Sequence, residues 1–273
     1  MMTLKSVSKL RNTQLINRAV RLALLGSTLS LAACGGGSFS STYSGPSASI
    51  TSEAELMPER NLRAALREWE RRYQRNPRNK TAAMNFAATL RAAGRYEQAV
   101  AILRRTVLEN ERDRDVLAAY AKALTSAGRF SEALQVISRA HTEADPDWRL
   151  HSAQGTILDQ LGRHGDARIE YGKALQIVPD EPTVLSNLGM SYLLEGNLPE
   201  AERTLRQAVQ SGRNTDRRVR ANLALVVGLQ GRFDEAMQLA RQDLPPEQAE
   251  ANIGYLREML SEPDRWGQIA QSE

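Results

Sequence analysis

The pattern of apolar and polar positions changes twice along the 273-residue chain. Residues 22–33 form an uncharged, mostly apolar run of twelve residues, and the following segment 34–54 is rich in Gly, Ser and Thr. From about residue 58 the strong helix formers Ala, Leu, Arg, Glu and Gln dominate, without the apolar–polar alternation of strands. The pattern therefore predicts an all-α domain over residues 55–265, followed by a short tail at 266–273.

One spacing recurs through the predicted domain. A glycine followed five residues later by an alanine returns at intervals of 34, 34, 34 and 35 residues: Gly94/Ala99, Gly128/Ala133, Gly162/Ala167, Gly196/Ala201 and Gly231/Ala236. This resembles the tetratricopeptide repeat, a 34-residue helix–turn–helix unit. The resemblance implies that Gly196 ends a first helix in a left-handed conformation, and that Gly155 and Gly189 lie where two helices press together. We expect a solenoid of about five helix pairs, with capping helices at 64–75 and 247–260.

The N-terminal pattern predicts export and lipid attachment. Residues 1–33 hold five basic residues and no acidic one, and the apolar run is too short to span a membrane core of about 30 Å. It ends in LAAC at 31–34, which resembles the bacterial lipobox. The resemblance implies cleavage after the signal peptide 1–33 and lipidation of Cys34 with three acyl chains, enough for stable anchoring. The alternatives are an ordinary discarded signal, or a short buried helix with an incidental cysteine.

Cleavage would change the charge balance. The full chain has a net charge of +4, but the part after residue 33 holds 31 basic and 32 acidic residues, so nucleic acid is not an expected partner. Cys34 is the sole cysteine, which rules out an intramolecular disulfide. Segment 34–54 is expected to be a flexible linker with a reach of about 25 Å. Gly35, in place of Asp, favours the outer membrane, with the protein facing the periplasm.

The ionisable residues show no catalytic pattern. The histidines are His141, His151 and His164; none lies four residues from another, and no HExxH motif is present. His141 and His164 fall near expected turns and are predicted to be solvated, while a surface or packing role is favoured for His151. The sequence therefore predicts a protein that is not an enzyme and holds no metal or cofactor.

The expected function is binding along the concave side of the solenoid, which the first helix of each repeat lines. The candidate groove contacts are three asparagines in one phase of the repeat and three adaptable apolar residues: Asn85, Asn187, Asn222, Met84, Met190 and Leu193. An amide can both donate to and accept from a peptide backbone. The alternative is that Asn is simply a common residue of the repeat at this position.

Two stretches, 147–197 and 219–236, resemble TadD-type lipoproteins of the Flp (tight adherence) pilus assembly system beyond the repeat pattern itself. The similarity runs over roughly residues 60–265. It implies a lipid-anchored scaffold that assists assembly of the pilus secretion machinery, as a pilotin-like factor for the secretin. Cys34 is the one functional residue that carries over. The alternative is a general envelope scaffold, for example for peptidoglycan enzymes, unrelated to pili.

Overall fold

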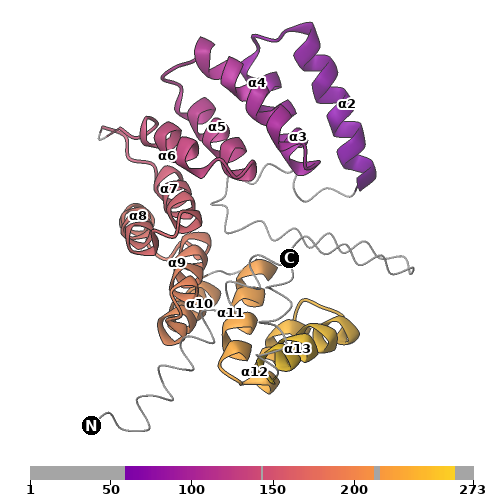
Figure 1. Cartoon of the computed structure of the whole chain (residues 1–273), viewed down its shortest axis with the longest axis vertical. Coiled ribbons are helices and arrows are strands. Elements are labelled where there is room, and N and C mark those ends of the chain that lie inside the picture. The colour runs from indigo at the N-terminus through magenta and orange to yellow at the C-terminus, as the bar shows by residue number, and fades with distance from the viewer. Residues whose placement is uncertain (1–58, 143, 212–215, 262–273) are drawn as a thin grey trace, which may run out of the picture. The chain divides into compact units, whose positions relative to one another are not determined.

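The computed structural model describes residues 59–142, 144–211 and 216–261, and all regular secondary structure in these ranges is α-helical (Figure 1). No helix in the described ranges is both long and apolar enough to cross a membrane. The prediction of an all-α repeat fold is confirmed. The predicted signal peptide, Cys34, the linker and the tail at 266–273 lie outside the described residues.

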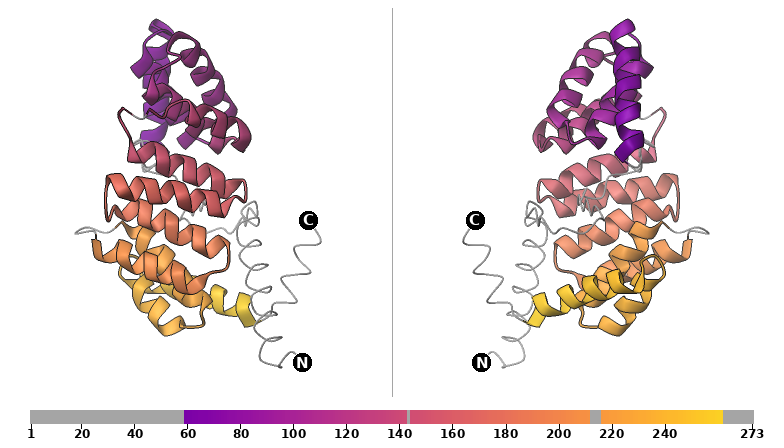
Figure 2. Two further views of the ribbon diagram at one scale, coloured as in Figure 1. Left: turned by 90° about the vertical axis from the view of Figure 1, so that its left-hand side faces the viewer. Right: turned by 90° about the vertical axis from the view of Figure 1, so that its right-hand side faces the viewer.

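The described residues fall into two compact units. The N-terminal unit, 59–179, contains α2 (Glu59–Arg75), α3 (Lys80–Ala92), α4 (Tyr96–Glu109), α5 (Arg114–Ser126), α6 (Phe130–Ser138), α7 (Trp148–Gln160) and α8 (His164–Ile177). The C-terminal unit, 180–261, contains α9 (Pro182–Leu194), α10 (Leu198–Ser211), α11 (Arg217–Leu229), α12 (Phe233–Arg241) and α13 (Pro246–Ser261). Within each unit every helix packs against the next in the chain (Figure 2).

The first helix of each repeat is α3, α5, α7, α9 or α11. Each of these helices begins at a capping residue whose side chain accepts a hydrogen bond from a backbone N–H of the first turn: Asn79, Asp113, Asp147, Glu181 and Asp216. An acceptor at this position satisfies one of the backbone N–H groups that the helix leaves unpaired, a contribution of about 1 kcal/mol. These five helices also end alike, because the glycines of the repeated pattern follow them with φ between 72° and 84°. The left-handed conformation predicted for Gly196 is confirmed, with a φ of 84°.

The second helices approach closely because small residues lie at the contacts. Each alanine of the repeated pattern is fully buried: Ala99, Ala133, Ala167, Ala201 and Ala236. A Cβ built on Gly155 would lie 2.6 Å from Cε1 of Tyr171, and one on Gly189 would lie 2.7 Å from Cγ of Leu205. The predicted close helix contacts at these two glycines are therefore confirmed.

Terminal helices cover the exposed ends of the two cores. The first cap is longer than the predicted 64–75, because α2 begins at Glu59. Its Trp69 and Tyr73 pack against the core of the N-terminal unit, with the Tyr73 ring 5.7 Å from the ring of Phe86. At the other end, α13 matches the expected 247–260 within a residue at each side, and its Leu256 contributes to the core of the C-terminal unit.

Candidate functional site

The first helices of neighbouring repeats contact one another within each unit. In the N-terminal unit α5 packs against α3 and α7, and in the C-terminal unit α11 packs against α9 and α13. They therefore form one face of each unit, the arrangement that the repeat pattern predicts for a binding surface.

Two of the three candidate asparagines form hydrogen bonds within the protein, and the third is buried. Asn85 is half-buried, and its Nδ2 donates to the carbonyl of Thr81 at 2.9 Å. The Nδ2 of Asn222 donates to the hydroxyl of Ser186 at 3.0 Å, which joins α11 to α9. Asn187 is buried. These contacts support a structural role for Asn222, and partner binding by the three amides stays a prediction.

The candidate apolar contacts lie in the cores. Met190 and Leu193 are each 2% exposed and belong to the core of the C-terminal unit, so they present almost no surface to a partner, unlike the groove contacts expected of them. The physical reason is that α9 is packed on two sides, by α10 at Gly189 and by α11, whose Asn222 bonds to Ser186. Met84 is half-buried and packs against the core of the N-terminal unit.

The third repeat gathers two histidines that lie ten residues apart in the sequence. The His141 and His151 rings are 4.4 Å apart, and the Nδ1 of His151 lies 2.7 Å from Oε2 of Glu170 on α8. Lys173 also donates to Glu170. Burial lowers the pKa of His141, and the neighbouring His151 lowers it further. His141 is half-buried rather than solvated as predicted, because its ring packs against the ring of His151 on α7.

A second polar network lies in the same repeat. Asp159 is 4% exposed, and its Oδ1 lies 2.8 Å from Nδ1 of His164. The hydroxyl of the fully buried Tyr171 donates to Oδ2 of Asp159 at 2.9 Å. The prediction of a solvated His164 is thus wrong, since its ring is held against a buried carboxylate. Burial, and Asp159 beside it, raise the pKa of Tyr171 well above its usual range, so the phenol stays protonated.

The tyrosine network offers packing rather than reaction chemistry. Tyr171 is buried and protonated, so it can act neither as a base nor as an accessible nucleophile. Across the described ranges, no group of three or more His, Cys, Asp or Glu side chains is arranged to hold a metal ion.

An open hollow of about 400 Å³ lies beside the histidines, between α6, α7 and α8. Leu134, Leu158 and Ile169 supply apolar walls, and Ile169 is exposed. Gln154 also lines the hollow, and its Oε1 atom is buried there. The hollow was not apparent from the sequence, because its three walls come from different helices.

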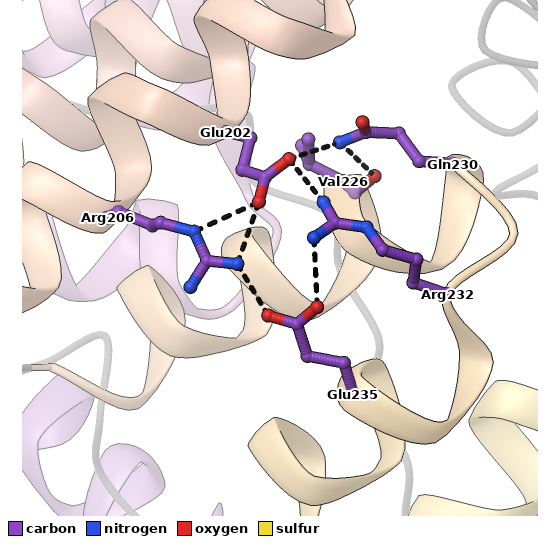
Figure 3. Close-up of polar contacts among 6 residues, drawn as sticks. All are labelled: Glu202, Arg206, Val226, Gln230, Arg232 and Glu235. Carbon is purple, nitrogen blue, oxygen red and sulfur yellow. Dashed lines mark hydrogen bonds and ion pairs between the residues drawn. The ribbon is translucent and has the colours of Figure 1, made fainter.

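In the C-terminal unit, four alternating charges close a ring between α10 and the start of α12 (Figure 3). Glu202 accepts from Arg206 at 2.7 Å and from Arg232, and Glu235 accepts from the same two arginines. Gln230 also donates to Glu202, at 2.8 Å. The hydrogen bond from Arg232 is the main cause that lowers the pKa of Glu202 to about 2.

Glu202→Gln is expected to lower the free energy of unfolding of the C-terminal unit by about 1–2 kcal/mol at neutral pH, a value reduced because the arginines are partly exposed. The folded pKa lies below the ordinary value of 4.5, so the ring's contribution is complete above about pH 4.5 and is lost as the pH falls towards 2. Urea unfolding across this pH range should show the two proteins converging. The control is Glu200→Gln, whose pair with Arg203 is exposed and should matter by less than about 0.5 kcal/mol. A constant difference between wild type and Glu202→Gln at every pH would contradict the assignment.

Comparisons with known proteins agree with this architecture. A model of the tetratricopeptide repeat matches residues 56–123, 90–157 and 160–226, and a second model of the same repeat matches 217–242. The comparison with curated proteins found no match.

Solved structures with similar folds include the following three proteins. The thermophilic repeat protein TTC0263 of Thermus thermophilus is 21% identical, with a TM-score of 0.56 over 64% of this chain and 97% of its own. PilW, described as a widely conserved type IV pilus biogenesis factor, is 18% identical, with a TM-score of 0.58 over 74% and 91%. Pseudomonas aeruginosa pilF is 18% identical, with a TM-score of 0.52 over 67% and 82%. At these identities the likeness is one of fold.

Proposed function

Because the chain belongs to the tetratricopeptide repeat family, a family of protein–protein interaction scaffolds, we propose that it is a lipid-anchored scaffold that assists assembly of the Flp (tight adherence) pilus secretion machinery. In this role it acts as a pilotin-like factor for the secretin. It is held by Cys34 in the outer membrane and faces the periplasm.

The observation that carries the proposal is the order of segments: LAAC at 31–34, a Gly/Ser-rich stretch, and then the repeats. The stretches 147–197 and 219–236, which resemble TadD-type lipoproteins, give the pilus system as the setting. PilW is described as a pilus biogenesis factor, so this fold serves pilus assembly in at least one other protein.

The packed histidine and tyrosine networks support a binding role over a catalytic one. They lie inside the third repeat, where they fix α7 against α8. The faces formed by the first helices are then the surfaces left for a partner.

Cys34→Ser, introduced at the native locus, tests the anchor and the function together. We expect the variant to incorporate no labelled palmitate, to leave the outer-membrane fraction, and to lower the amount of assembled secretin multimer and surface pili. Circular dichroism of the purified variant should show folded repeats. A variant that fractionates with the outer membrane as firmly as wild type would contradict the lipid anchor.

The alternative, a general envelope scaffold, makes a different prediction. Purification of the lipidated protein with its partners would then recover peptidoglycan enzymes and no pilus component. Normal secretin assembly in a deletion strain would likewise overturn the pilus role while leaving the lipid anchor intact.

A further inference from the structure

The capping helix α2, at the start of the N-terminal unit, carries a row of arginines. Arg63, Arg67, Arg71 and Arg75 are spaced four residues apart on α2, and all four are exposed. Residues at this spacing share one face of a helix, and twelve residues of helix extend for about 18 Å. We call these four residues the arginine ridge.

The opposite face of α2 is committed to the protein core. Leu66, Trp69 and Tyr73 pack against the core of the N-terminal unit, and α3 is the helix they lie against. Figure 2 shows α2, in indigo, as the outermost helix of its unit. The ridge therefore points away from the packed interior of the N-terminal unit.

Two of the four ridge arginines are not compensated by a carboxylate of the described residues. Like charges four residues apart repel and weaken a helix. Arg71 pairs with Glu68, whereas Arg67 and Arg75 have no carboxylate within ion-pair distance in the part of the chain that the structure describes. A row of cations held in this way is suited to an anionic surface outside the protein.

Basic residues are also more frequent in the N-terminal part of the mature chain than in its C-terminal part. Residues 59–80 hold eight Lys and Arg against three Asp and Glu. Residues 46–179 hold 21 basic and 17 acidic residues, whereas 180–273 hold 10 and 15. The mature chain is close to neutral as a whole, but its basic residues are thus concentrated in and around α2, the helix that follows the lipid-anchor segment in the sequence.

We propose that the arginine ridge lies on the anionic phospholipid surface of the membrane in which Cys34 is anchored. This rests on the proposed lipid anchor for its setting. Residues 35–58 separate the anchor from α2, and a Gly/Ser-rich chain of that length reaches about 27 Å, which allows the ridge to meet the headgroups. A basic face beside an acyl anchor supplies a second membrane signal. It would hold the N-terminal unit against the membrane in one orientation.

The test uses the mature chain from residue 34 with Cys34→Ser, so that no lipid contributes to binding. Vesicles of phosphatidylcholine, with and without phosphatidylglycerol, are sedimented with the protein at low and at high salt. The variant is Arg67→Gln with Arg75→Gln, which keeps good helix formers and breaks no ion pair in the described residues. The matched control is Arg104→Gln with Arg105→Gln, which removes the same charge from two exposed positions on α4.

We expect wild type to bind the vesicles that contain phosphatidylglycerol, to ignore pure phosphatidylcholine, and to be released by high salt. Each ridge arginine should contribute about fivefold to the partition coefficient, so the ridge variant should bind about 25-fold more weakly. The control should change it by less than about threefold. Equal weakening by both variants would show that net charge alone is at work, and would overturn the proposal.

Absence of wild-type binding to the anionic vesicles would also overturn it, and would direct attention to an acidic protein as the partner of the ridge. Because the tested chain lacks the lipid, neither result bears on the anchor at Cys34 or on the role in pilus assembly. Those are decided separately by palmitate labelling and by secretin assembly.

Discussion

Gly189→Leu is expected to destabilise the C-terminal unit by about 3 kcal/mol, at the upper end of what overpacking costs. A Cβ at this position would lie 2.7 Å from Cγ of Leu205 and 3.2 Å from the carbonyl oxygen of Ala201. The leucine side chain has some freedom to move, but the carbonyl belongs to the backbone of α10. To make room, α9 and α10 would have to separate along their contact.

The matched control is Gly254→Leu on α13 of the same unit. Gly254 is exposed, and nothing lies within 4 Å of the Cβ that would be added. Replacing a helical glycine at such a site should stabilise the helix by about 0.5–1 kcal/mol. Urea unfolding followed by circular dichroism measures both. If the two substitutions shift the midpoint alike, α9 and α10 are not in close contact at Gly189.

Asp159→Ala is expected to lower the free energy of unfolding of the N-terminal unit by about 2–4 kcal/mol. The carboxylate accepts from the hydroxyl of Tyr171 and holds the ring of His164, and its removal leaves a buried hydroxyl without that partner. Thermal unfolding monitored by Tyr and Trp fluorescence would measure the loss.

Asp166→Ala serves as the control because it removes the same group from the first turn of α8. The Asp166 side chain is exposed and pairs with Arg163 on the surface, where an ion pair contributes less than about 1 kcal/mol. Asp159→Asn should recover part of the loss, since the amide oxygen can still accept from Tyr171. Equal effects of Asp159→Ala and Asp166→Ala would contradict a contribution of the buried network to the free energy of unfolding.

The repeats could be predicted from the sequence because their chemistry is local. A glycine in the left-handed conformation, an alanine at a close contact and a cap before each first helix depend on a few neighbouring residues. The capping residues recur at the same intervals as the glycines, as Asp113 and Asp147 illustrate. They could therefore have been predicted from the sequence together with the glycines.

The remaining features depend on which side chains meet across helices. Glu170 lies 19 residues from His151, and no spacing in the sequence indicates that α8 turns this carboxylate towards the imidazole. Met190 was expected in the groove but is buried, since the positions of the neighbouring helices decide whether a residue of α9 faces a groove or a core. Pairing at a distance and the choice of face are both products of tertiary packing.

The row of caps and glycines has a consequence for how such a chain can change in length. Each first helix carries its own start signal, such as Asp113, and its own stop signal, such as Gly128. A recombination event between two equivalent caps removes or duplicates one whole block, and the new junction joins a cap to a helix of the same kind. The number of repeats can therefore change during evolution without a new turn sequence having to arise.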